Sequence, residues 1–183
     1  MRTMRAYLGA VLLAASVLLT ASTATTPWVG AGAGESPDSA PWEGAIRAMD
    51  DALARGDLRG ALRAREDARL AALSSQRWEG MVMVGDATLR LGRSAGLLPA
   101  MEPAARRAYT FALHRANRQG SLDGTIRITL AFAGLGDRDM VRKGFAIAEN
   151  LAGTSRDPHA IERVRSLEQW IAAEMPSTGM RLA

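Results

Sequence analysis

An internal repeat is the feature that most constrains the fold. The block WEGAI begins at Trp42, recurs as WEGMV at Trp78 after 36 residues, and returns as LDGTI at Leu122 after a further 44. A period of this length is typical of proteins built from stacked supersecondary units, each of which buries its apolar face only against its neighbours. The sequence therefore predicts a row of similar units.

The similarity continues downstream of each block. The matching positions are Asp50 and Asp86; Leu53 and Leu89; and Gly56, Gly92 and Gly136. The pairs Gly56-Asp57 and Gly136-Asp137 are predicted to form equivalent corners between helices. Ser39 and Ser75, each three residues ahead of a tryptophan, are predicted to cap the helices that follow.

The spacing of 44 indicates an insertion of eight residues in the second unit. After Gly92 the sequence contains Gly96, Pro99 and Pro103, which predicts a loop there. Matching positions in the second helices shift by 44 and then 36, and they are Ala61, Arg65 and Ala68; Ala105, Tyr109 and Ala112; and Val141, Phe145 and Ala148. The insertion thus falls between the two helices of the second unit, where the apolar residues 97–101 are expected to cover the core or, alternatively, to contact a partner.

Composition favours helices throughout. The chain is 48% hydrophobic but only 5% aromatic, and a core rich in alanine suits closely packed helices. The predicted helices are 42–55, 58–74, 78–91, 103–118, 122–135, 138–152 and 158–175. We therefore expect an all-α fold, a short α-solenoid of about three helix-turn-helix repeats with a C-terminal capping helix. A generic helical bundle is the alternative.

This pattern resembles the tetratricopeptide-repeat family. The family places small residues where two helices cross, Gly-Asp at the turn, and Ala-x3-aromatic-x2-Ala in the second helix. The matching residues are Gly85; Gly136, Asp137, Phe145 and Ala148; and Ala61 with Ala68. The resemblance covers residues 42–175 but departs from the family in its period of 36, its interrupted second repeat and Arg65 at an aromatic position, so other helical-hairpin solenoids stay open.

The resemblance implies that a peptide or protein segment binds in a groove lined by the first helix of each repeat. The residues expected there are Glu43, Ile46, Asp50, Leu53, Glu79, Val82, Asp86, Leu89, Arg90, Asp123, Ile126 and Leu130. An apolar groove edged by carboxylates suits a segment with apolar anchors and one or two basic groups. Alternatively, Glu43, Glu79 and Asp123 only stabilise the positive N-terminal ends of their helices.

The N-terminus has the pattern of a targeting segment. Arg2 and Arg5 precede an uncharged apolar stretch over residues 6–20, and small residues up to Ala24 provide a cleavage site. Residues 1–24 are therefore expected to be a signal peptide, 25–41 a flexible linker, 42–175 the repeat domain and 176–183 a tail. Cleavage near Ala24 makes the protein periplasmic or secreted; an uncleaved span over residues 7–24 instead anchors it in the membrane, with the repeat domain outside the cytoplasm.

Charge and residue types provide no catalytic signature. The formal charge is +4, but Lys143 is the only lysine and no block of like charges appears, so nucleic acid is not an expected partner. The absence of cysteine excludes disulfides and thiolate metal sites, and His114 and His159 lack metal-ligand spacing.

We therefore expect a non-enzymatic scaffold for protein binding in the cell envelope, with no cofactor and no metal. The alternatives are a structural subunit of a self-associating envelope assembly and, less favoured, an enzyme with an unrecognised site. The identity of the partner and the oligomeric state stay open.

Overall fold

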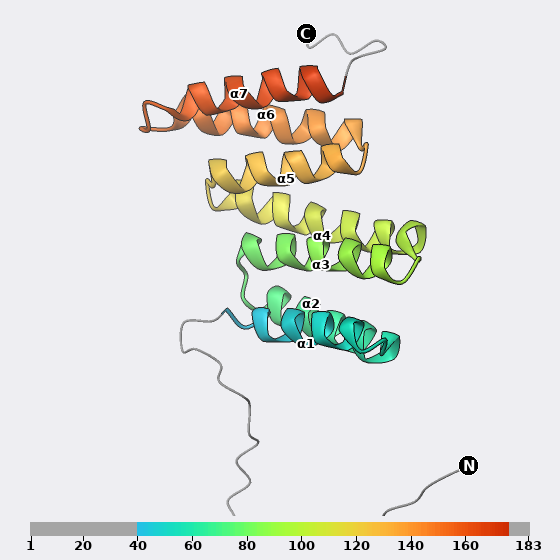
Figure 1. The fold of residues 1–183 in the computed structure, drawn as a ribbon. Coiled ribbons are helices and arrows are strands. Elements are labelled where there is room, and N and C mark those ends of the chain that lie inside the picture. The colour runs from blue at the N-terminus through green and yellow to red at the C-terminus, as the bar shows by residue number, and fades with distance from the viewer. Residues whose placement is uncertain (1–39, 176–183) are drawn as a thin grey trace, which may run out of the picture. The chain divides into compact units, whose positions relative to one another are not determined.

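The structure, a computed structural model, describes residues 40–175, and these form seven α-helices and no strand (Figure 1). The predicted leader, nearly all of the linker and the tail (residues 1–39 and 176–183) lie outside the described residues. The helices are α1 Glu43–Ala54, α2 Leu58–Ser74, α3 Trp78–Ser94, α4 Leu98–Arg118, α5 Leu122–Gly134, α6 Arg138–Thr154 and α7 Ala160–Glu174. The prediction of an all-helical chain is confirmed for this part.

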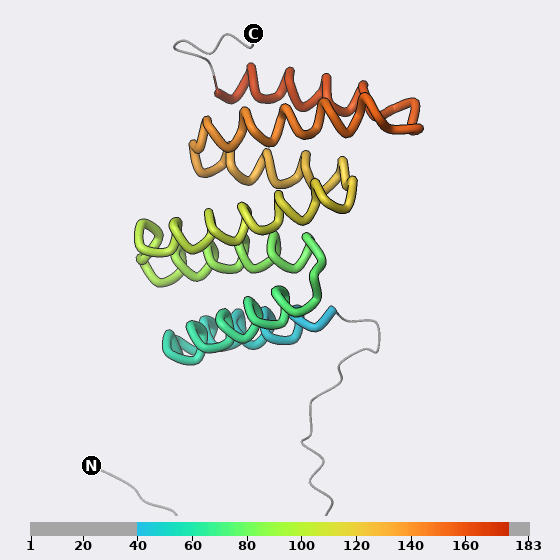
Figure 2. Tube along the Cα trace, turned by 180° about the vertical axis from the view of Figure 1, so that it is seen from behind, coloured from blue at the N-terminus to red at the C-terminus, as the bar shows by residue number. Residues whose placement is uncertain are grey.

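The helices form antiparallel hairpins that are stacked in chain order. Each helix packs against the next, and contacts also join α1 to α3, α3 to α5, α5 to α7, and α4 to α6 (Figures 1 and 2). We call α1, α3, α5 and α7 the first helices, and α2, α4 and α6 the second helices. None of the helices between residues 40 and 175 combines the length and the apolar character needed to cross a bilayer.

Glycines with positive φ end four of the helices. Gly56, Gly96, Gly120 and Gly136 have φ between 64° and 71°, a conformation that glycine adopts without steric cost. At three of these corners the next residue caps the following helix, and the bonds run from the N–H of Gly60 to Asp57, of Gly124 to Ser121 and of Met140 to Asp137. The predicted Gly-Asp corners are thus confirmed.

The corner between α2 and α3 is built differently. The predicted helix-capping role of Ser75 is wrong: this residue follows the end of α2, where its hydroxyl donates to the carbonyl of Ala72. Ser39, the other predicted cap, lies outside the described residues. Gln76 has φ of +60°, the conformation that glycine has at the other corners, and α3 begins after Arg77 without a side-chain cap.

A buried arginine secures this corner. Arg115 of α4 is 6% exposed and donates to the carbonyls of Ala72 and Leu73, both at 2.9 Å, and of Arg77 at 3.2 Å. Burial lowers the pKa of Arg115. Carbonyls at a helix C-terminus lack partners within the helix and carry partial negative charge, so a cation satisfies them well. Arg115 therefore joins the first hairpin to the second.

The tryptophan-led block is explained by a contact that recurs at two junctions. The buried ring of Trp42 lies so close to Gly80 that a Cβ there would be 2.8 Å from the ring and 3.0 Å from Ala72. A Cβ at Gly124 would likewise lie 2.8 Å from the ring of Trp78 and 3.0 Å from Ala116, which is the alanine of α4 at the position that matches Ala72. The glycine of one block therefore receives the tryptophan of the preceding block.

The loop predicted within the second unit is wrong, because the additional residues lengthen helices instead. The helix α3 runs to Ser94 and α4 begins at Leu98, so the corner is three residues long. Pro99 lies in the first turn of α4, where backbone N–H groups have no partner within the helix, so the absence of an N–H costs nothing there. Pro103 is accommodated inside a continuous helix. Leu98 and Met101 pack against the core, which confirms that this apolar stretch covers it.

No helix follows α7 among the described residues. Ile161 is 60% exposed, although the residue 36 positions earlier, Thr125, is fully buried. Glu168 similarly corresponds to the buried Phe132. An open hollow of about 310 Å³ therefore remains between α6 and α7, and charged residues replace the buried ones along it.

Candidate binding surface on the first helices

We call the outward side of α1, α3, α5 and α7 the first-helix face. Three of the predicted groove residues, Ile46, Val82 and Leu89, are only 6%, 1% and 8% exposed and belong to the core. Partial or full exposure is retained by Glu43, Asp50, Leu53, Glu79, Asp86, Arg90, Asp123, Ile126 and Leu130. The face is therefore more polar than the sequence indicated.

Two hollows lie on this face at successive junctions. The α3–α5 hollow has a volume of about 280 Å³ and is lined by Asp86, Leu89, Arg90, Arg93, Tyr109, Ala131 and Gly134. The α5–α7 hollow has a volume of about 320 Å³ and is lined by Asp123, Ile126, Leu130, Arg163, Ser166, Leu167 and Trp170. Six of the twelve predicted residues therefore line one hollow or the other.

Exposed apolar side chains distinguish the α5–α7 hollow. Leu130 is 36% exposed and Trp170 is 40% exposed. A tryptophan on a surface provides a large rigid contact area, which is common at the centre of protein interfaces. Trp170 was not among the predicted groove residues, because its part in the hollow depends on how α7 is placed against α5.

Most of the predicted acidic residues have arginine partners within the chain. Asp50 pairs with Arg90 at 3.1 Å and Asp86 pairs with Arg127 at 3.2 Å, and Asp123 pairs with Arg163. Each of these pairs joins one first helix to the next. Exposed ion pairs contribute little stability individually, but they compete with any ligand for the same carboxylates.

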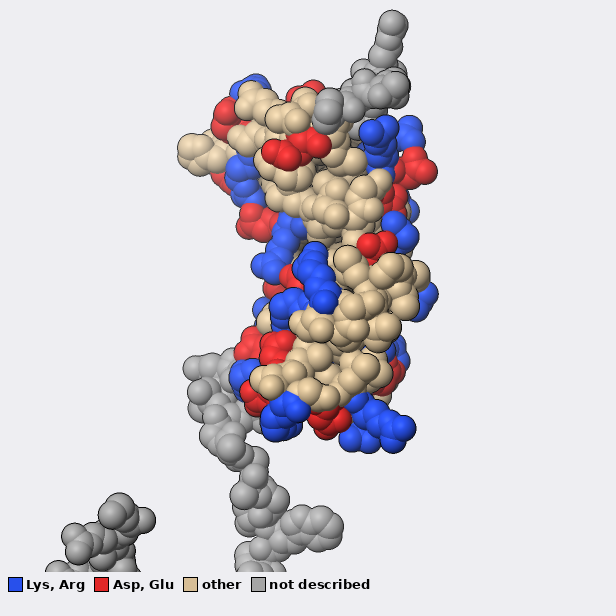
Figure 3. All heavy atoms as spheres, turned by 45° about the vertical axis from the view of Figure 1, so that its right-hand side comes forward, with Lys and Arg blue, Asp and Glu red and all other residues tan. Residues whose placement is uncertain are grey.

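The other two predicted carboxylates lie at the starts of their helices. Glu79 pairs with Arg77 at 3.1 Å, while Glu43 has no ion pair with any described residue. Figure 3 shows basic and acidic side chains interspersed beside an uncharged area, in keeping with this pairing. A basic ligand segment would have to displace arginines at four of the five predicted carboxylates.

The floor of the α3–α5 hollow is rigid. The hydroxyl of Tyr109 donates to Asp86 at 2.7 Å, and its ring packs edge-on against Phe132 with centroids 5.8 Å apart. Burial, reinforced by the neighbouring carboxylate, raises the pKa of Tyr109 well above its usual value. Gly85 allows this packing, because a Cβ there would lie 2.3 Å from the tyrosine ring. Gly85 thus lies where α3 and α4 pack closely together, as expected of the small residue at this position.

Groups suited to metal binding do not converge in this part of the chain. Between residues 40 and 175, no three histidine, aspartate or glutamate side chains are placed to hold one ion. His114 and His159 are both exposed, and neither lines the α3–α5 hollow or the α5–α7 hollow.

Comparisons of the chain with protein-family models, with curated proteins and with solved structures found no match. The hollows and ion pairs of the first-helix face are therefore the basis for a functional proposal.

Proposed function

We propose that this chain is a non-enzymatic interaction module, a short solenoid of tetratricopeptide-like hairpins that binds a protein segment on its first-helix face. The observation that supports this most directly is the pair of adjacent hollows at the α3–α5 and α5–α7 junctions. An extended segment that follows the stack would place one side chain in each hollow.

The chemistry of the two hollows favours apolar anchors. Leu130 and Trp170 provide exposed apolar contacts in the α5–α7 hollow, while the carboxylates nearby are already paired with arginines. Affinity would come chiefly from the buried apolar anchors, and charged groups of the segment would set its register along the row of ion pairs.

The cell envelope is the proposed location. The apolar leader and its small-residue end support export, and the segment rich in proline and glycine up to residue 41 would separate the helical stack from a membrane. Release after cleavage near Ala24 and retention through residues 7–24 are the two forms of this proposal.

A structural subunit that associates with itself is the second candidate. The observation that favours it is the open hollow beside α7, where Ile161 is 60% exposed at a position that is buried in the preceding hairpin. Light scattering of the purified chain separates the two candidates, because a monomer at all concentrations would contradict self-association.

Crosslinked capture of the full chain from its native envelope tests the binding module. The test variant is Leu130→Glu with Trp170→Glu, which places charges in the α5–α7 hollow, and the control is Leu70→Glu, a 50% exposed leucine on a second helix. We expect the double variant to lose its specific partner while the control keeps it, with equal helicity by circular dichroism.

Recovery of the same partner at the same yield from all three proteins would contradict binding at this face. Charge reversal at Glu79 and Asp86 is a less selective test, because Asp86 accepts hydrogen bonds from Tyr109 and Arg127 and its loss would disturb the fold.

A further inference from the structure

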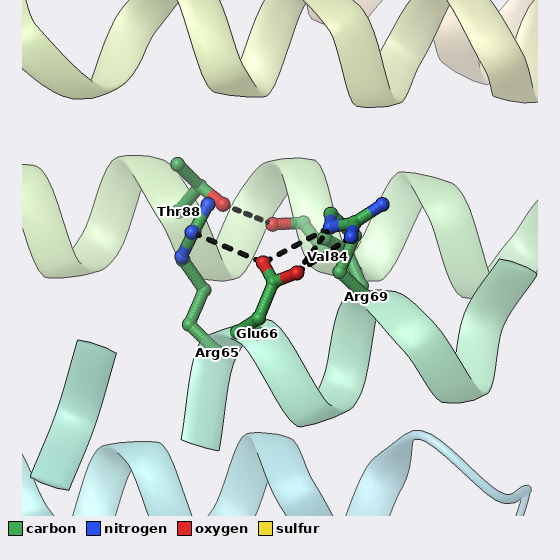
Figure 4. Close-up of polar contacts among 5 residues, drawn as sticks. All are labelled: Arg65, Glu66, Arg69, Val84 and Thr88. Atoms are coloured by element: carbon green, nitrogen blue, oxygen red, sulfur yellow. Dashed lines mark hydrogen bonds and ion pairs between the residues drawn. The ribbon is translucent and has the colours of Figure 1, made fainter. Parts of the chain in front are cut away.

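A hollow of about 410 Å³ lies on the other side of the stack, between the second helices α2 and α4. The helices α4 and α6 pack directly against each other, whereas α4 reaches α2 through longer side chains, such as Arg115 at the α2–α3 corner. The lining of the hollow is Arg65, Glu66 and Arg69 from α2; Met81, Val84 and Thr88 from α3; and Ala104, Arg107, Ala108 and Phe111 from α4. We call it the arginine hollow; Figure 4 shows the part of it formed by α2 and α3.

Positive charge exceeds negative charge in the arginine hollow. Its single carboxylate, Glu66, is held by Arg69, whose Nε lies 3.0 Å from both carboxylate oxygens and whose Nη2 lies 2.5 Å from one of them (Figure 4). Hydrogen bonding from Arg69 lowers the pKa of Glu66, so this carboxylate is ionised at neutral pH. Arg107 has no ion pair with any residue between 40 and 175.

Arg65 occupies a position where the other repeats have a buried aromatic residue. The matching residues Tyr109 and Phe145 are 1% and 7% exposed, and the side chain of Arg65 is 19% exposed. Its Nε is buried and has no hydrogen-bond partner among the described residues, while its Nη2 reaches Glu66 only at 3.4 Å. A buried N–H donor without an acceptor is costly, so an acceptor placed beside the guanidinium of Arg65 would stabilise it.

Apolar atoms form the rest of the hollow. Met81 and Val84 of α3 are 2% and 1% exposed, and Phe111 of α4 is 53% exposed. A concave site of a few hundred Å³ with an apolar lining and a few convergent polar groups is typical of small-molecule binding. Guanidinium groups match the planar, two-oxygen geometry of a carboxylate.

We propose that the arginine hollow binds a small amphipathic organic acid, a carboxylate attached to a short alkyl or aryl body. The carboxylate accepts hydrogen bonds from Arg65 and Arg107, and the apolar body contacts Met81, Val84 and Phe111. The apolar part of the lining favours such an acid over inorganic phosphate, which has no apolar body to bury there.

Nitrogen-15 NMR of the purified full chain tests this site, with hexanoate as the probe and hexanamide as its uncharged match. We expect hexanoate to shift the Nε–H signal of Arg65 in a saturable manner, and hexanamide to leave it unchanged. Arg107→Gln should weaken hexanoate binding by about tenfold, the loss of one charge-assisted hydrogen bond. Arg59→Gln, which replaces an exposed arginine of α2 outside the hollow, is the matched control and should bind as the parent does.

A second variant, Arg65→Tyr, installs the residue found at the matching position of the next repeat and is expected to fold and to lose hexanoate binding. Equal responses to hexanoate and hexanamide, or equal affinities of the Arg107→Gln and Arg59→Gln variants, would overturn the proposal. Tighter binding of inorganic phosphate would refute the carboxylate assignment. Tighter binding of a blocked peptide with glutamate between two leucines than of hexanoate would also overturn the proposal, because the ligand would then be a protein segment and not a small acid.

Discussion

Replacing Gly124 by alanine should destabilise the protein, although alanine is the better helix former. In an open helical position this exchange stabilises by up to about 1 kcal/mol. At Gly124, however, the new Cβ would lie 2.8 Å from the ring of Trp78 and 3.0 Å from Ala116. The ring is large and rigid, so it must move together with the hairpin that carries it.

The magnitude follows from the two opposing effects. Overpacking of a core costs about 1–3 kcal/mol, which outweighs the gain in helix propensity and leaves a net loss of about 1–2 kcal/mol. The control is Gly134→Ala in the same helix, where a Cβ meets no atom within 4 Å. Urea unfolding followed by circular dichroism should therefore separate the two variants by about 2 kcal/mol.

A double-mutant cycle then assigns the loss to one contact. Trp78→Leu introduces the residue that begins the third block and removes the ring that Gly124→Ala would strike. In this background Gly124→Ala should become nearly neutral, which corresponds to a coupling energy of about 1–2 kcal/mol. If Gly124→Ala matches Gly134→Ala in stability, or if the coupling energy is zero, the ring of Trp78 is not the reason that position 124 requires glycine.

Four further substitutions test the corners and the core. Asp57→Ala should cost about 1 kcal/mol in urea unfolding through loss of a helix cap, and Asp137→Ala should cost more, because Asp137 also pairs with Arg106 at 2.8 Å. Gln76→Gly should raise the unfolding free energy by about 1 kcal/mol, because it relieves the positive φ at that corner; an unchanged value would show that the backbone there carries no strain. Tyr109→Phe should cost about 1 kcal/mol at neutral pH. Because the pKa of Tyr109 is raised in the folded state, the parent should also lose stability above pH about 10, where an unfolded tyrosine ionises, and denaturant titrations should show a shallower loss for the phenylalanine variant.

Much of the fold was predictable because its determinants are local or recur at a fixed spacing. The block at Trp42 and Trp78 identified the junctions, and Gly136 with Asp137 identified a corner from two adjacent residues. The prolines near residue 100 were misleading, because each was read as a helix breaker. In the first turn of a helix proline costs little, and the packing of Leu98 against α3 supports a helix there.

The candidate surface was less predictable, because it depends on pairs that lie far apart in the sequence. Arg127 and Arg163 neutralise aspartates 41 and 40 residues earlier, and no local signal marks such partners. Ile46 and Val82 were assigned to the groove, but they are buried among the helices. A periodicity of 3.6 residues locates an apolar stripe without showing which neighbouring helix covers it.

Between residues 40 and 175, no contact joins the two ends of the stack. Among the described residues, α1 and α2 pack against each other and against α3, Arg115 of α4 reaches the end of α2, and α7 packs against α5 and α6. Opening one end therefore leaves the remainder folded, so amide exchange should slow from both ends toward the centre. A ligand seated in both hollows of the first-helix face would join three helices that the chain itself links only pairwise. Binding of such a ligand should therefore slow amide exchange along most of the stack, including helices that the ligand does not contact.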